Sequence, residues 1–456
     1  MGDISYFRSC GFVYVEKKKK MKKKVYIETY GCQMNVADSE LVVTILENDN
    51  YILTNKIEEA DIILVNTCAV REHAEQRVLS RLDYFNTFKR KKASLKIGVI
   101  GCMAERVKEK LFEQKPFVDI IAGPDSYRNL HKMIETTESG QKTVNVLLSR
   151  EETYEGILPT RYNSNRISAF ISIMRGCDNM CTFCIVPFTR GRERSRSVDS
   201  ILEETRQIVS EGYKEITLIG QNVDKYLYKG INFANLLRLV ANEAKGVRIR
   251  FSTSYPEHFT EEVMQTMAES DNICHYIHLP VQSGSNRILE LMKRGYTREW
   301  YLDKIKMIRS YVDDVAISTD IIAGFCGETE EDHNDTLKLM EEAKFDYAYM
   351  FKYSERPGTY AAKFLKDDVE EKVKLRRLNE IIFLQRKLSE ESNKKDVGRI
   401  FEVLVEGVSK KSDKEFFGRN SQNKVIVFPK KKVKKGDIVK VRVTGYTSAT
   451  LRGEIV

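Results

Sequence analysis

Three cysteines within eight residues form the sharpest chemical signal in the sequence. Cys177, Cys181 and Cys184 lie on a glycine-initiated loop directly after the apolar run 167–174. Three thiolates with this spacing can bind three irons of a cubane iron–sulfur cluster and leave its fourth iron open. Zinc normally takes four ligands in paired cysteine or histidine spacings, and no histidine occurs between residues 132 and 257. The loop therefore favours an iron–sulfur cluster over zinc.

Three further cysteines each end a short apolar run of the kind typical of buried strands. They are Cys32, Cys68 and Cys102, at the ends of the runs 25–32, 61–68 and 96–102. Helix-like sequence follows each run, which is the pattern of a parallel α/β sheet. Because parallel strands end at one edge of their sheet, the three thiols can converge there. We expect a shared metal site, either an iron–sulfur cluster with one open iron or a zinc that needs a fourth ligand. Three buried core cysteines are the alternative.

The sequence that follows the cysteine loop predicts a partial (β/α)6 barrel. Six strand-like runs alternate with helix-like segments, at 167–174, 215–219, 247–252, 275–279, 315–321 and 346–351. Functional sites in such barrels lie at the carboxyl ends of the strands. Polar or glycine-rich sequence occupies those ends here, and we expect it to form a cofactor pocket rather than ordinary loops. Cys274 and Cys326 are single cysteines, which we interpret as structural. No side chain is distinctive enough to be named as a general acid or base.

The last segment, 395–456, predicts a small β-barrel of the OB type, with short alternating strands between glycine, asparagine and lysine turns. It holds fifteen basic and seven acidic residues, and Phe416 and Phe417 lie close to Arg419. Lysines attract phosphates and exposed aromatic rings stack on unpaired bases, so the segment suits RNA binding. A solvated lysine turn with core phenylalanines is the alternative.

A run of arginines follows the cysteine loop. Arg190, Arg192, Arg194 and Arg196 alternate with other residues, so in an extended segment all four would lie on one side. We expect them to contact RNA phosphates or a charged partner. Ion pairs inside the protein are the alternative.

Length and composition set the frame for these sites. The chain has 456 residues, of which 42% are hydrophobic and 31% charged, so it is typical of a globular protein with about three domains. No apolar run is long enough for a membrane helix. We place the domains at 25–150, 151–394 and 395–456, after a disordered basic leader over 1–24. Nine cysteines without a secretory signal indicate a reducing cytoplasm.

Taken together, the motifs resemble the methylthiotransferases, a family of radical S-adenosylmethionine (SAM) enzymes. The Cys177 loop is similar to the radical SAM signature, and Val65-Asn-Thr-Cys-Ala-Val-Arg-Glu72 is similar to the family's amino-terminal domain. The other matching segments are Glu28–Asn35, Arg175–Arg192, His278–Ser285 and Tyr353–Thr359. The resemblance covers roughly residues 25–456. Around Cys68 it is strongest to members that act on isopentenyladenosine in tRNA.

The resemblance implies one four-iron–four-sulfur cluster for each set of three cysteines. It also implies SAM bound to the cluster of the Cys177 loop and a TRAM domain at the carboxyl end of the chain. The implied SAM contacts are Phe183, Gly220, Gln221, Ser254, Gln282 and Asp320. The implied RNA contacts are Arg190, Arg192, Phe417 and Arg419.

The implied reaction adds a methylthio group to carbon 2 of isopentenyladenosine, next to the anticodon of a tRNA. The implied partners are the anticodon stem-loop, a reductant such as flavodoxin or ferredoxin, and a sulfur donor. We expect a cytoplasmic monomer that does not use a membrane. Methylthiotransferases acting on threonylcarbamoyl-adenosine or on an aspartate of a ribosomal protein share the architecture and are the alternatives. A non-catalytic iron–sulfur RNA-binding protein would leave the barrel unexplained.

Overall fold

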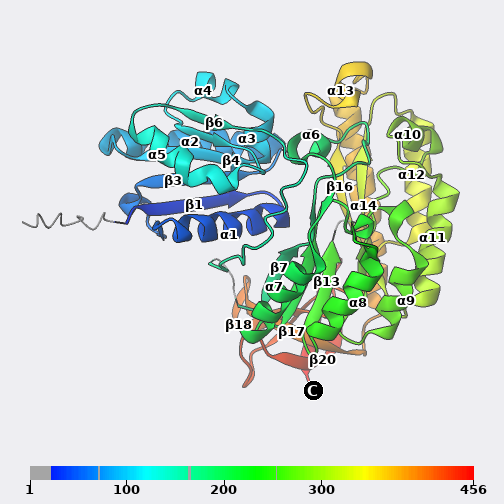
Figure 1. Cartoon of the computed structure of the whole chain (residues 1–456). Coiled ribbons are helices and arrows are strands. Elements are labelled where there is room, and N and C mark those ends of the chain that lie inside the picture. The colour runs from blue at the N-terminus through cyan, green and yellow to red at the C-terminus, as the bar shows by residue number, and fades with distance from the viewer. Residues whose placement is uncertain (1–21, 70–71, 163–165, 253) are drawn as a thin grey trace, which may run out of the picture.

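The computed structural model describes residues 22–69, 72–162, 166–252 and 254–456, and it folds into three units joined along the chain (Figure 1). Most of the leader expected over 1–24 lies outside the described residues. The amino-terminal unit packs beside the central unit, and the carboxyl-terminal barrel lies at one end of the central unit (Figure 1). None of the helices in these ranges is long and apolar enough to cross a membrane.

The amino-terminal unit is a six-stranded parallel sheet in the order β2-β1-β3-β4-β5-β6. Its strands are β1 (Lys24–Tyr30), β2 (Ile52–Leu53), β3 (Ile62–Thr67), β4 (Lys96–Gly101), β5 (Ile120–Ala122) and β6 (Thr143–Asn145). Its main helices are α1 (Gln33–Asn48), α2 (Glu72–Lys91), α3 (Cys102–Val107), α4 (Lys110–Gln114) and α5 (Leu130–Glu138). Separate apolar cores cover its two faces, which is why β3 and β4 are almost wholly buried. The predicted parallel α/β sheet is confirmed.

The central unit contains the six expected strands, arranged as two three-stranded parallel sheets. They are β7 (Ser168–Ser172), β10 (Glu215–Ile219) and β13 (Arg248–Ser252), then β14 (Tyr276–His278), β15 (Ala316–Ala323) and β16 (Tyr347–Lys352). A parallel bridge between Ile249 and Ile273 leads from the first sheet towards the second. Within the described residues β7 and β16 do not pair, so the barrel is partial, as predicted.

Helices cover the outside of this barrel and share one large apolar core with its strands. They are α7 (Val198–Ser210), α8 (Phe233–Glu243), α9 (Glu261–Glu269), α11 (Arg298–Tyr311), α12 (Glu330–Ala343) and α14 (Glu371–Lys394). Three shorter helices, α6 (Val186–Arg190), α10 (Asn286–Leu291) and α13 (Tyr360–Phe364), lie towards the carboxyl ends of the strands (Figure 1).

The carboxyl-terminal unit is a closed five-stranded barrel in the order β17-β18-β19-β21-β20, which confirms the predicted small barrel. Its strands are β17 (Ile400–Ser409), β18 (Ser412–Arg419), β19 (Val425–Pro429), β20 (Ile438–Tyr446) and β21 (Leu451–Ile455). Arg248 and Arg250, near the start of β13, donate to main-chain carbonyls of this barrel at 2.7–3.0 Å. The barrel is therefore attached to the amino ends of the central strands, opposite the end where the cysteine loop lies.

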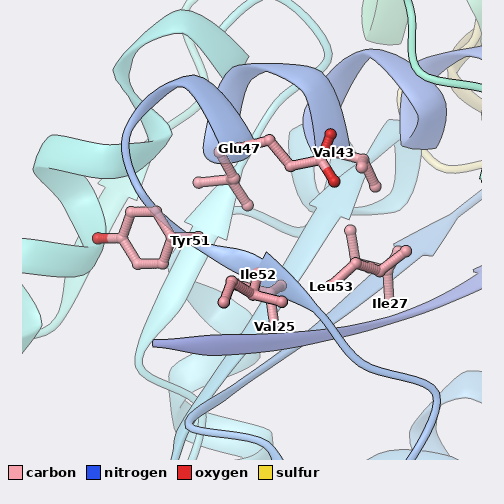
Figure 2. A pocket seen from close by; sticks show the side chains of 8 residues that line it. Val25, Ile27, Val43, Glu47, Tyr51, Ile52 and Leu53 are labelled. Carbon is pink, nitrogen blue, oxygen red and sulfur yellow. The ribbon is translucent and has the colours of Figure 1, made fainter. Parts of the chain in front are cut away.

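A small hollow in the amino-terminal unit lies between α1 and the strands β1 and β2 (Figure 2). Apolar side chains such as Val25, Ile27 and Val43 form most of its lining, with Glu47 and Tyr51 at its rim. None of the six candidate cluster cysteines lines it. We interpret the hollow as a gap in packing.

Candidate functional site

The cysteine loop leaves the barrel after β8 (Met174–Arg175) through a turn that only glycine can make. Gly176 has φ +81°, and a Cβ at this position would lie 1.9 Å from the carbonyl oxygen of Arg192. The amide of Gly176 donates to Gln221 Oε1 at 2.6 Å, and the amide of Cys177 donates to the carbonyl of Gly191 at 3.1 Å. The start of the loop is thus held from two sides.

The far half of the loop is attached to α10. Thr182 donates through its amide to the carbonyl of Met292 at 3.1 Å and through Oγ1 to the carbonyl of Leu291 at 2.8 Å. Burial raises the pKa of Cys177 to about 11 and that of Cys184 to about 12. Such thiols stay protonated near neutral pH by themselves, whereas a bound metal deprotonates its thiol ligands. Hydrogen bonds thus fix both halves of the loop, and these thiols would have to lose their protons on binding a cluster.

A buried arginine contacts this loop, and sequence reasoning did not single it out. Arg294, which is 4% exposed, donates from Nη1 to Cys181 Sγ at 3.3 Å. Its other nitrogens donate to the carbonyl of Pro280 at 2.7 Å and to the hydroxyl of Tyr296 at 2.9 Å. The guanidinium is thereby fixed in orientation with a donor directed at the sulfur.

The second set of cysteines gathers at the carboxyl edge of the amino-terminal sheet. Cys32 precedes α1, Cys68 follows β3 and Cys102 begins α3. A hydrogen bond with Cys68 lowers the pKa of Cys32 to about 6, whereas burial, together with the charge of Cys32, raises the pKa of Cys102. Cys32 is exposed, whereas Cys68 and Cys102 are buried. The parallel sheet thus brings together thiols that are far apart in sequence.

Two buried asparagines order the loops around this second set. Asn35 Oδ1 accepts from the amide and the thiol of Cys32 at 3.3 Å, and its Nδ2 donates to Asn66 Oδ1 at 3.0 Å. Asn66 Nδ2 in turn donates to the carbonyl of Asn35 at 2.9 Å. The segments that carry Cys32 and Cys68 are locked together by these bonds.

The kind of metal that each set suits follows from how the thiols are arranged. Within the described residues, no three cysteine, histidine, aspartate or glutamate side chains are grouped so that they could hold one metal ion. In a cubane cluster each cysteine binds a different iron, so the sulfurs need not converge on a single point. Both sets are therefore compatible with clusters, and neither has the arrangement of a zinc site. Their role as ligands stays a prediction.

The two sets of cysteines adjoin across the interface between the first two units. Ile185, the residue after Cys184, packs against Cys102 and Ala69 in a buried apolar cluster. The short helix α6, which follows, packs on α3 of the amino-terminal unit. Figure 1 shows α6 between the two units.

The arginine run corrects the prediction of an RNA contact at Arg190. Its side chain is 3% exposed and pairs with Asp38 of α1 at 2.7 Å, while Nε donates to Cys102 Sγ at 3.1 Å. Arg194 pairs with Asp125 at 3.0 Å, and Arg196 pairs with a buried glutamate of α7. Arg190, Arg194 and Arg196 are therefore buried in ion pairs inside the protein, which was the alternative to RNA binding.

Arg192 differs from its neighbours in the run. Its side chain is 72% exposed and pairs only loosely with Asp178, at 3.2 Å. A contact between Arg192 and RNA stays a prediction.

The predicted SAM contacts lie after barrel strands (Gly220, Gln221, Ser254 and Gln282), within β15 (Asp320) or on the cysteine loop (Phe183). Gly220 is packed against Met174. A Cβ added at Gly220 would lie only 2.6 Å from Met174 Cγ. Gln282 has φ +78° and joins the sheet, because its amide donates to the carbonyl of Asp320 at 2.9 Å. Asp320 also lies 3.5 Å from His278. Phe183 packs edge-on against Phe325. Of these residues, Gly220 and Gln221 contact the start of the cysteine loop, and the contact of the whole set with SAM stays a prediction.

Ser254 has a partner that the sequence did not indicate. Its hydroxyl donates to Asp224 Oδ1 at 3.1 Å, and the amide of Tyr255 donates to Oδ2 at 3.0 Å. Burial raises the pKa of Asp224 to about 7. Asp224 thus orders the start of the loop after β13.

The two predicted RNA contacts in the carboxyl-terminal barrel are less accessible than expected. Phe417 is half-buried beside Gly407. Arg419 pairs with Glu406 at 2.5 Å and lies 3.9 Å from Glu215 of β10, so its guanidinium serves the contact between the barrel and the central unit. Arg419 keeps about a third of its side chain exposed (31%), so a contact between Arg419 and RNA stays a prediction.

Comparison with known proteins assigns a family to each unit. Residues 24–123 match the uncharacterized protein family UPF0004, residues 171–340 match the radical SAM superfamily, and residues 394–456 match the TRAM domain. Among solved structures, the radical SAM methyltransferase TsrM from Kitasatospora setae superposes with a TM-score of 0.56. It is 12% identical and covers 75% of this chain and 74% of its own. At that identity the likeness concerns the fold alone.

Relatives of known name match almost the whole chain. A protein of Bacteroides fragilis is 54% identical, covering 95% of this chain and 96% of its own. Another, from Amoebophilus asiaticus, is 56% identical and covers 95% and 92%. A third, from Porphyromonas gingivalis, is 52% identical and covers 96% of both. All three are named tRNA-2-methylthio-N(6)-dimethylallyladenosine synthase. The chain belongs to this family of radical SAM methylthiotransferases.

Proposed function

We propose that the protein adds a methylthio group to carbon 2 of N(6)-dimethylallyladenosine (isopentenyladenosine) beside the anticodon of tRNA. The observation that carries the proposal is the contact between the two cysteine sets, where Ile185 of the loop meets Cys102 of the sheet edge. Forming a carbon–sulfur bond on an unreactive base carbon requires a sulfur source close to a radical source. The identity of 52–56% with the named relatives supports the substrate.

Each set of cysteines would hold one four-iron–four-sulfur cluster. Cys177, Cys181 and Cys184 would bind the cluster that reduces SAM, and the set around Cys68 would bind the cluster that carries the sulfur. Bound in these places, the cofactors supply redox and radical chemistry that no side chain provides.

The chain itself fixes the position of the cysteine loop, provides an apolar contact between the two sets and places a positive charge beside a sulfur. Gly176, Gln221 and Thr182 hold the loop in one conformation. Arg294 presents a fixed donor to Cys181, and Ile185 forms a buried apolar contact with Cys102 of the other set. Such preorganisation is the part of radical catalysis that a protein scaffold performs.

The position of the TRAM domain defines how RNA would lie. The barrel is attached to the amino ends of the central strands, so RNA that contacts both its lysines and the cysteine edge must run along the side of the central unit. A splayed base would enter at the far end, at a cost of about a few kcal/mol for unstacking. We propose further that the protein works as a cytoplasmic monomer with a reductant such as flavodoxin or ferredoxin and a separate sulfur donor.

The test is anaerobic reconstitution with iron and sulfide, followed by incubation with SAM, a reductant and an isopentenylated anticodon stem-loop. Mass spectrometry of the nucleosides should show the 2-methylthio product. A Cys274→Ala variant is the matched control, because this buried cysteine lies at the other end of the barrel and should leave the product unchanged. If 5′-deoxyadenosine forms while the nucleoside stays unmodified, the substrate is wrong. The threonylcarbamoyl-adenosine and ribosomal-protein substrates would then be tested.

A further inference from the structure

One cation of the central unit reaches the sulfur of a cysteine in the amino-terminal unit. Arg190 ends α6, six residues after Cys184, and its Nε donates to Cys102 Sγ at 3.1 Å. Its Nη2 pairs with Asp38 Oδ2 at 2.7 Å, which fixes the guanidinium against α1. Both side chains are buried, so the contact is little screened by solvent.

This contact does more than dock the two units. Arg175 pairs with the same Asp38 at 2.9 Å, and Arg194 pairs with Asp125 at 3.0 Å, so other arginines already join the units. Arg190 adds a hydrogen bond to a candidate cluster ligand, as Arg294 does for Cys181. Each set of cysteines therefore has a buried guanidinium against one of its sulfurs, and for the second set that guanidinium comes from the other unit.

We propose that Arg190 is a positioning residue that tunes the cluster held by Cys32, Cys68 and Cys102. The proposal rests on the two-cluster assignment made above. A cluster gains negative charge when it is reduced, and a hydrogen bond to a ligand sulfur, together with a nearby cation, stabilises that charge. Arg190 thus raises the reduction potential of the sulfur-carrying site and makes that potential depend on the docking of the radical SAM unit.

The test isolates the second cluster. In a parent variant with Cys177, Cys181 and Cys184 all changed to alanine, only the sheet-edge cysteines can bind a cluster. Its midpoint potential is then measured by electron paramagnetic resonance during a redox titration, without SAM or RNA. Adding Arg190→Gln should shift the midpoint to more negative values. Arg190→Lys should shift it less in the same direction, because a shorter point charge cannot serve both Asp38 and Cys102.

Arg192→Gln is the matched control, since it removes the same charge from the same segment at an exposed position. It should leave the midpoint unchanged. Iron content and the thermal unfolding midpoint show whether each variant keeps its cluster and its fold.

The outcomes separate this proposal from the one it rests on. If the parent variant takes up no iron, the second cluster does not exist and both proposals fail. If the parent holds its cluster but Arg190→Gln leaves the midpoint where it was, only the role of Arg190 is overturned. Should the glutamine variant lose its iron, the lysine variant decides, and a midpoint equal to that of the parent overturns the proposal.

Discussion

The two sets of cysteines reach similar arrangements by opposite routes. Cys177, Cys181 and Cys184 are brought together by a single loop, whose course depends on one glycine and a few hydrogen bonds. The other three come from separate strand ends and meet only because the sheet is parallel and in register. The first site is encoded locally, and the second is a property of a whole folded domain.

Their surroundings differ in the same sense. Arg294, which contacts Cys181, belongs to the same unit as the loop. Arg190, which contacts Cys102, belongs to the neighbouring unit. The loop site is thus complete within its own domain, whereas the sheet-edge site acquires part of its environment from docking. Mutations can separate the two sites on this basis.

The largest effect is expected from Cys181→Ala. Loss of this ligand should abolish formation of 5′-deoxyadenosine and, with it, the methylthio product. Chromatographic quantification of 5′-deoxyadenosine checks the result. Normal SAM cleavage by this variant would contradict the assignment of the loop.

Cys68→Ala should separate the two sites. Because Cys68 belongs to the other set, this variant should still cleave SAM but form no methylthio nucleoside. Iron content should fall by about the share of one cluster, since only one of the two proposed clusters is lost. Detection of the product would remove the sheet-edge cysteines from the role of sulfur site.

Gly176→Ala tests how strictly the conformation of the cysteine loop depends on a glycine at this position. A Cβ here would meet the carbonyl oxygen of Arg192 at 1.9 Å, at a residue with φ +81°. We expect the free energy of unfolding to fall by roughly 3 kcal/mol, the upper end for strained residues, and the loop to lose iron. Urea titration and iron analysis measure both.

Gly212→Ala is the control for that substitution. Gly212 has φ +82° but open space around it, so only the conformational cost of about 1–2 kcal/mol should appear, with iron unchanged. Equal losses in the two variants would mean that the contact with Arg192 does not matter.

The smallest effect concerns the TRAM barrel, which should influence neither cysteine site. Lys434 and Lys435 are exposed, and changing both to glutamine should weaken tRNA binding while SAM cleavage and iron content stay unchanged. The slope of log affinity against log salt should flatten by roughly 0.9 for each phosphate that a lysine no longer neutralises. Lys306 and Lys338, which are also exposed but lie on the central unit, serve as the pair of controls. A salt slope that stays the same would exclude this loop as the RNA-binding segment.

Much of the fold could be predicted because strand-forming patterns are local. The six barrel strands and the strands that lead to Cys32, Cys68 and Cys102 are apolar runs bounded by polar or glycine-rich sequence. The pattern failed where strands are short or only half-buried. β5 and β6 have three residues each, and β18 begins with Ser-Asp-Lys-Glu, which carries no alternation of apolar residues.

The arginines show more clearly what sequence patterns cannot predict. The spacing of residues 190–196 is compatible with a solvent-facing stripe, yet Arg190 and Arg194 are buried against Asp38 and Asp125, which are about 150 and 70 residues away in sequence. Arg294 and Asp224 gave no signal for the same reason. The ion-pair partner of a charged side chain cannot be predicted from the local sequence when the partner is distant in the chain.

The sequence by itself determined which residues are candidates for the chemistry, since the residue types and spacing of the cysteine loop and the repeated strand-end cysteines predict two thiolate sites that suit iron–sulfur clusters. Only the tertiary structure decided that the two sites adjoin, that Arg190 and Arg294 each direct a donor at a sulfur, and that the TRAM barrel lies at the opposite end. Candidate ligands can be recognised from residue type and local spacing. The distance between the two sites and the charges around their sulfurs depend on contacts between residues that are distant in sequence.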